Sequence, residues 1–190
     1  MLTIPNLLTL LRIILVPFFL VASFRGMYVA AFTIFVSAAV TDVFDGMIAR
    51  RFNQRSRIGA ILDPVADKTM MICGYLFYTL RDGLPLVSIP GWLTFVVFIR
   101  DFLILAFAYL LYTRVNVKRF PPSWAGKLST GLQAGTLATT IAVDGFLPQL
   151  LGLAGLLFHV ALVVTLYSAW DYLRRGERLL DDGVGAAGGA

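Results

Sequence analysis

Two neighbouring segments give the strongest indication of the fold of this chain: Thr41-Asp42-Val43-Phe44-Asp45-Gly46-Met47-Ile48-Ala49-Arg50 and, after a basic run, Gly59-Ala60-Ile61-Leu62-Asp63-Pro64-Val65-Ala66-Asp67. They set four carboxylates inside stretches that are otherwise apolar enough to lie in a bilayer. Ionisable groups within a membrane are costly, and they usually mark a functional site. The spacing therefore indicates a membrane protein whose chemistry lies at these aspartates.

The composition places the carboxylates in a membrane. The 190 residues are 58% hydrophobic and 14% charged, and the mean hydropathy is +0.81. A soluble domain of this composition would expose large apolar patches. Apolar segments long enough to cross the hydrocarbon core as helices occupy residues 5–24, 27–50, 58–80, 90–112, 123–143 and 147–173. We predict an all-α integral membrane protein in which six transmembrane helices form one domain over residues 1–180, with a disordered Gly/Ala tail at 181–190.

The distribution of basic residues predicts the orientation of the helices. Arg12, the Arg50–Arg57 run, the 114–127 connection and the C-terminal arginines fall on one side of six spans, and Arg25 and Arg81 fall on the other. The positive-inside rule places both termini and the active-site cavity on the cytoplasmic side. Because the basic face adjoins a bilayer, we expect anionic lipid and phosphorylated substrates as partners, and no nucleic acid. A bacterial-type cytoplasmic membrane fits this pattern.

The four carboxylates are expected to form one metal site. Asp42 and Asp45 are three residues apart and Asp63 and Asp67 are four apart, so each pair shares a helix face. The small residues Gly46, Ala49 and Gly59 line the same stripes and leave room for a ligand. An all-oxygen donor set suits a hard cation, Mg²⁺ or Mn²⁺, and four carboxylates suit two ions.

Two metal ions beside an arginine are typical of displacement at phosphorus. In that chemistry Arg50 would neutralise charge on phosphate, and Asp67, the deepest of the set in its helix, would accept the proton of the attacking hydroxyl. Two alternatives remain. The aspartates could form intramembrane salt bridges with Arg50 and another basic group, or they could be the ion site of a cation transporter.

At these residues the chain resembles the CDP-alcohol phosphotransferase family, whose signature is Asp-x2-Asp-Gly-x2-Ala-Arg-x8-Gly-x3-Asp-x3-Asp. Every fixed position is matched. The resemblance implies six transmembrane helices, a dimetal site and attack of an alcohol on a CDP-linked substrate with release of CMP. It further implies that Asp42, Asp45, Asp63 and Asp67 bind metal and that Asp67 is also the base. The residues that it implies for binding the CDP-alcohol are Asn6, Gly46, Ala49, Arg50, Ser56 and Gly59.

The wider chain resembles the branch of this family that transfers a phosphatidyl group from CDP-diacylglycerol to glycerol 3-phosphate. The segments that carry this likeness are 4–12, 41–46, 49–54 and 62–68. Where that branch commonly has Glu after Arg100, this chain has Asp101. Phosphatidylglycerol, the acceptor of a cardiolipin synthase, and inositol phosphate are the alternative acceptors.

Arg100 and Lys127 are the candidates for binding the phosphate of the acceptor, because a dianion needs fixed cations. The alternative for Arg100 is an ion pair with Asp101 or Asp171, and for Lys127 a solvated position on the basic face. A stripe of Gly and Ala from Gly126 to Ala138 favours close helix packing, and a homodimer is expected there.

Overall fold

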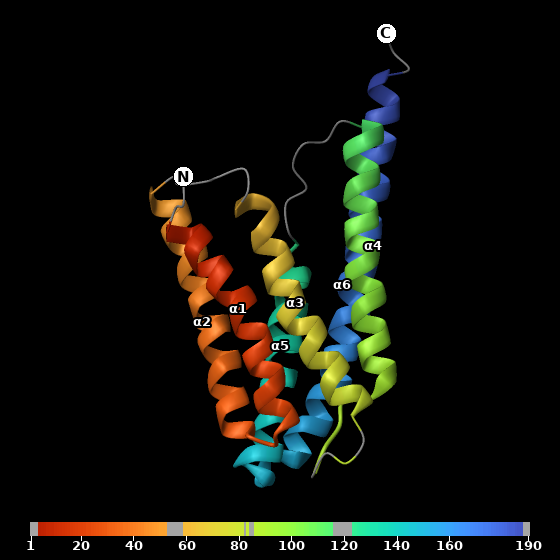
Figure 1. Ribbon diagram of the computed structural model, residues 1–190. Helices are drawn as coiled ribbons and strands as arrows, with labels where there is room; N and C mark the ends of the chain where they lie inside the picture. Colours follow the sequence, from red (N-terminus) through yellow and green to blue (C-terminus); the bar gives the residue numbers. More distant parts are fainter. Residues whose placement is uncertain (1–3, 53–58, 82, 84–85, 116–122, 188–190) are drawn as a thin grey trace. The chain divides into compact units, whose positions relative to one another are not determined.

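A computed structural model describes the backbone of residues 4–52, 59–81, 83, 86–115 and 123–187, and within these the side chains of residues 10–41, 68–81, 83, 86–106 and 123–175. All of the secondary structure that it describes is helical (Figure 1). The elements are α1 (Ile4–Phe24), α2 (Tyr28–Phe52), α3 (Gly59–Leu80), α4 (Gly91–Val115), α5 (Trp124–Gly145), the 3-10 helix η1 (Pro148–Leu150) and α6 (Leu151–Ala187).

Six α-helices occupy the six apolar segments, so the predicted all-α fold is confirmed, and most helix ends lie within a few residues of the predicted ones. The breaks have local causes. Gly26 and Gly83 have φ of 70° and 81°, a left-handed conformation that glycine adopts at low cost. The largest difference is in α6, which continues to Ala187 and so enters the segment that was predicted to be disordered.

The contacts divide the chain into two compact units, which we call unit 1 (residues 1–89 and 137–154) and unit 2 (residues 90–136 and 155–190). Unit 1 contains α1, α2 and α3, together with the end of α5 and the start of α6. Unit 2 contains α4 and the remaining parts of α5 and α6. The acidic signature (Asp42, Asp45, Asp63 and Asp67) belongs to unit 1, whereas Arg100 and Lys127 belong to unit 2.

In unit 1, α1 packs against both α2 and α3. The rings of Phe19 and Phe35 lie 6.1 Å apart between centroids, and both side chains are buried. α3 approaches α5 closely, because a Cβ atom on Gly74 would lie 2.5 Å from Cδ2 of Leu137. Apolar side chains thus join α1 to α2, and a close glycine contact joins α3 to α5.

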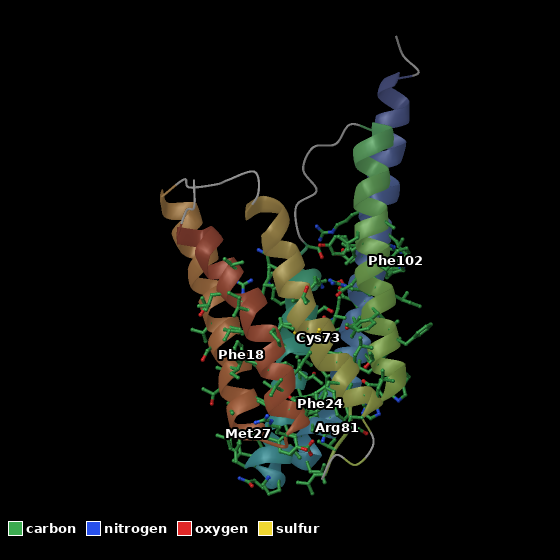
Figure 2. All side chains as sticks on the ribbon, viewed as in Figure 1. Phe18, Phe24, Met27, Cys73, Arg81 and Phe102 are labelled. Carbon is green, nitrogen blue, oxygen red and sulfur yellow. The ribbon has the colours of Figure 1, made fainter. Side chains whose placement is uncertain are left out.

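The end of unit 1 away from the acidic signature is closed by polar contacts. Arg81, which follows α3, donates from Nη1 to the Ser23 carbonyl at 2.6 Å and from Nη2 to the Phe24 carbonyl at 2.9 Å, so it caps α1 (Figure 2). Oδ1 of Asp144 accepts the backbone N–H groups of Leu86 and Val87 at 3.1 and 3.0 Å. These bonds fix the connection after α3 onto α5.

Both units expose large apolar side chains. Phe18 of unit 1 is 60% exposed, and Phe102 of unit 2 is 70% exposed (Figure 2). Many Leu, Val and Trp side chains are exposed as well, which is typical of a surface that meets lipid. Among the described residues, one stretch, Pro148–Arg175, is long and apolar enough to cross a membrane, and shorter apolar stretches lie at Leu10–Phe24 and Tyr28–Thr41.

The Gly/Ala stripe of α5 has two different environments. A Cβ on Gly126 would lie 2.9 Å from Cε2 of Tyr172 and 3.2 Å from Nη2 of Arg100, so this glycine packs inside unit 2. Gly131 and Gly135 are exposed, and a Cβ on either would have no neighbour within 4 Å. The homodimer therefore stays a prediction.

Candidate active site

The acidic signature lies on the last turns of α2 and the first turns of α3. α2 carries Asp42 and Asp45, and α3 carries Asp63 and Asp67. The end of α2, the start of α3 and the start of α1 lie at the same end of unit 1 (Figure 1). The helix placement that the spacing predicted is thus present in the backbone.

The carboxylate-bearing residues lie at comparable depths from that end. At a rise of about 1.5 Å per residue, Asp42 and Asp45 lie about 15 and 10 Å before the end of α2, and Asp63 and Asp67 lie about 6 and 12 Å after the start of α3. Asp42, Asp45 and Asp67 thus lie within about 5 Å of one another along the helix axes, and Asp63 lies nearer the end of the unit. Carboxylates on the two helices are therefore at suitable depths to share metal ions.

The donor chemistry fits a pair of hard cations. The side chains of the signature and of its neighbours lie outside the described set. These residues are Asn6, Asp42, Asp45, Gly46, Ala49, Arg50, Gly59, Asp63 and Asp67. Ser56 lies outside the described residues altogether. Among the described side chains, no three from His, Cys, Asp and Glu come together as a metal site. The fit therefore rests on four carboxylates, which are the ligands that Mg²⁺ and Mn²⁺ prefer.

Arg12 lies inside unit 1, although the charge pattern had placed it at the basic face. Its side chain is 4% exposed, whereas Leu11 and Ile14 on the same helix are 45% and 47% exposed. The sequence does contain a signal for this burial, since Arg12 interrupts an apolar run.

Arg100 lies in α4 and is 5% exposed. Its Nη1 donates to Oδ1 of Asp101 at 2.8 Å, and its Nη2 donates to Oγ of Ser168 at 2.8 Å and to the Gly126 carbonyl at 3.4 Å. Its guanidinium carbon lies 5.8 Å from the centroid of the Tyr172 ring. The ion pair with Asp101 is thus confirmed, while Nε is buried and has no hydrogen-bond partner among the described residues. We call this group the Arg100 cluster.

The Arg100 cluster includes the first turn of α5. Ser123 caps this helix, since its Oγ accepts the N–H of Gly126 at 2.9 Å. The Ser123 N–H in turn donates to the Tyr172 hydroxyl at 3.3 Å. Lys127 lies in the same turn and is exposed. A helix N-terminus with an exposed lysine and a buried arginine beside it has the charge to attract an anion.

A buried polar seam continues from this cluster along α5 and α6. Ser129 Oγ lies 3.1 Å from Thr165 Oγ1, and Gln133 Nε2 donates to Ser129 Oγ at 3.1 Å. All three side chains are at most 1% exposed. No local sequence pattern predicts this seam, because the hydrogen bonds of Ser129 and Gln133 to Thr165 join residues that are more than thirty positions apart.

Comparison with known proteins gives a family. Residues 2–167 match the family model described as CDP-alcohol phosphatidyltransferase. The chain is 38% identical over 173 residues to the CDP-diacylglycerol–glycerol-3-phosphate 3-phosphatidyltransferase of Escherichia coli (strain K12), which covers 90% of this chain and 92% of the relative. It is 37% identical over 181 residues to the protein of the same name from Salmonella typhimurium (strain LT2), covering 93% and 97%. The chain belongs to the CDP-alcohol phosphatidyltransferase family.

Proposed function

We propose that this enzyme transfers a phosphatidyl group from CDP-diacylglycerol to glycerol 3-phosphate, giving phosphatidylglycerophosphate and CMP. The observation that carries the proposal is similarity over nine-tenths or more of both chains to proteins named for this reaction. The acidic signature gives it a chemical basis, because the family match spans all four aspartates.

The residues of the signature divide the chemistry between them. Asp42, Asp45, Asp63 and Asp67 would hold two Mg²⁺ or Mn²⁺ ions, which supply charge to stabilise the attacking and leaving oxygens. Asp67 takes the proton from the attacking hydroxyl of the acceptor. The acceptor oxygen then forms a bond to the phosphorus of the phosphatidyl group, the bond from that phosphorus to the CMP oxygen breaks, and CMP leaves.

The other signature residues bind the donor substrate. Arg50 neutralises charge on the diphosphate, for which a planar guanidinium fork is well shaped. Gly46, Ala49 and Gly59 leave space for the nucleotide at the ends of α2 and α3. Asn6 and Ser56 complete the set that the family resemblance assigns to the CDP-alcohol.

Arg100 and Lys127 bind the phosphate of the acceptor in this proposal. Lys127 is exposed at the first turn of α5. Arg100 has five N–H donors, and its hydrogen bonds to Asp101, Ser168 and the Gly126 carbonyl use three of them. The buried Nε, to which no group in the described part of the chain is hydrogen-bonded, is an available donor for an anion.

The membrane arrangement belongs to the same proposal. Six spans with both termini in the cytoplasm place the acidic signature on the cytoplasmic side of a bacterial-type membrane, where glycerol 3-phosphate and the cytidine enter from water and the acyl chains enter from lipid. The exposed apolar side chains of both units support contact with lipid.

An acceptor panel tests the proposal. Detergent-purified protein is given CDP-diacylglycerol and Mg²⁺ with glycerol 3-phosphate, phosphatidylglycerol, inositol phosphate, serine or inositol, and CMP is measured. We expect release with glycerol 3-phosphate only. Release with phosphatidylglycerol instead would make the protein a cardiolipin synthase. Mg²⁺ transport by reconstituted protein without CMP release would support the transporter alternative.

A further inference from the structure

Arg12 is a buried cation to which the proposed reaction gives no role. It lies on the inner face of α1, in line with Val16 and Phe19, which are 7% and 0% exposed. The spacing of four and seven residues puts these three side chains on one face of the helix. Arg12 therefore faces the interior of unit 1, and does not extend along the surface to reach water.

The helices around that interior are α2 and α3, because α1 packs against both. Arg12 lies about 12 Å from the start of α1, and Asp67 lies about 12 Å from the start of α3. Both helices start at the same end of unit 1 (Figure 1). Arg12 and Asp67 are thus at nearly equal depth on two helices that pack together, and Asp45 lies within about 2 Å of that depth on α2.

The sequence offers Arg12 few counter-charges. The residues of unit 1 include six aspartates and no glutamate. Asp82 follows the far end of α3, and Asp144 accepts hydrogen bonds from Leu86 and Val87, also at the far end. The remaining four are those of the acidic signature. A charge buried in a helix bundle pairs with an opposite charge or with backbone carbonyls, and the acidic signature supplies the carboxylates at this end of unit 1.

We propose that Arg12 is a positioning residue that holds the carboxylate of Asp67 through an ion pair between α1 and α3. The inference rests on the proposed function for the role of Asp67. Arg12 fixes one carboxylate oxygen and leaves the other to take the proton of the acceptor hydroxyl. It also offsets part of the repulsion among the four carboxylates. A guanidinium is suited to this task, because its planar fork sets the orientation of the carboxylate.

Thermal unfolding of the full chain in detergent with EDTA tests the pair without metal or substrate. Arg12→Gln should lower Tm by on the order of 10 °C, because it leaves the carboxylate of Asp67 without its ion-pair partner. Arg12→Gln combined with Asp67→Asn should recover more than half of that loss. Arg25→Gln, at an exposed arginine of the same unit, is the matched control and should leave Tm within about 2 °C of the wild type.

A double variant that is less stable than Arg12→Gln alone would overturn the pair. Recovery by Asp45→Asn in place of Asp67→Asn would overturn the choice of partner. If Arg12→Gln does not yield folded protein, recovery of folded protein in the double variant supports the proposal, and failure of both overturns it.

Steady-state kinetics separates positioning from substrate binding. Arg12→Lys keeps the charge and loses the fork, so kcat should fall roughly tenfold to hundredfold, the range for a misplaced catalytic group. KM for both substrates should change by less than about threefold, because Arg12 does not contact them. A raised KM for CDP-diacylglycerol with kcat unchanged would make Arg12 a substrate ligand and overturn the proposal. A different acceptor in the panel would overturn the proposed function alone, since the unfolding experiment contains no acceptor.

Discussion

Unit 1 and unit 2 each bury an arginine, and the two arginines differ in how far along the chain their neighbouring residues lie. Arg100 in unit 2 has its ion-pair partner next to it in the chain, and its other contacts come from α5 and α6. Arg12 in unit 1 lies on α1 at the depth of the acidic signature, whose residues are thirty or more positions away. A local motif in the sequence thus identifies the reactive groups of a site, whereas the residues that support those groups come from other helices.

The largest expected effect is at the signature itself. Asp63→Asn should abolish detectable CMP release, because the loss of one anionic ligand weakens a hard-cation site directly. Asp67→Asn should retain CDP-diacylglycerol binding and lose turnover. The readouts are CMP release and equilibrium binding of CDP-diacylglycerol. Asp171→Asn is the control, since Asp171 lies outside the signature and pairs with Arg175 of the same helix. Near-normal turnover in Asp63→Asn would contradict the dimetal assignment.

The next effect separates the roles of Lys127 and Arg100, the two proposed phosphate ligands in unit 2. Lys127→Gln should raise KM for glycerol 3-phosphate roughly tenfold to hundredfold, the cost of one lost charge-assisted hydrogen bond in a partly desolvated site, and leave KM for CDP-diacylglycerol nearly unchanged. Arg100→Lys should do the same and also lower Tm, because a lysine cannot bind Asp101, Ser168 and Gly126 together. If Arg100→Lys lowers Tm but leaves both KM values alone, Arg100 is structural only.

Two glycines of α5 give a matched test of the Arg100 cluster. Gly126→Ala should destabilise the protein by about 1–3 kcal/mol, because its Cβ would press on Tyr172 and Arg100. Gly131→Ala should be neutral or stabilising by up to about 1 kcal/mol, since alanine favours helix and the site is open. Chemical denaturation measures both. Equal effects at the two positions would mean that the close contact at Gly126 does not exist.

The smallest effect concerns pH at the far end of unit 1. Asp144 follows the last apolar residue of α5, and burial raises the pKa of its carboxyl above 3.8, against the opposing effect of the hydrogen bonds from Val87 and Leu86. Because the folded-state pKa is the higher one, the protonated form favours folding, and this contribution is lost as pH rises through the folded-state value. Asp144→Asn should therefore raise Tm slightly at pH 7 and not below pH 3.8. A lower Tm at pH 7 would contradict this assignment.

The helices and the signature could be predicted from the sequence because both depend on local features. Apolar length and nearby glycines set the helix ends, and the spacing of the aspartates follows from helix geometry. The Arg100 cluster could be predicted only at Asp101, its neighbour in the chain. Ser168 and Tyr172 reach it from α6, and no local pattern connects them to α4. The burial of Arg12 likewise depends on which face of α1 meets α2 and α3.

Mn²⁺ binding is the most direct test of whether the end of α2 and the start of α3 form a dimetal site for phosphatidyl transfer. Purified protein in detergent is titrated with Mn²⁺, and free Mn²⁺ is followed by electron paramagnetic resonance. We predict two specifically bound ions per chain, both displaced by Mg²⁺, and at most one ion in Asp63→Asn. Absence of specific binding in the wild-type chain, with CDP-diacylglycerol present, would contradict it.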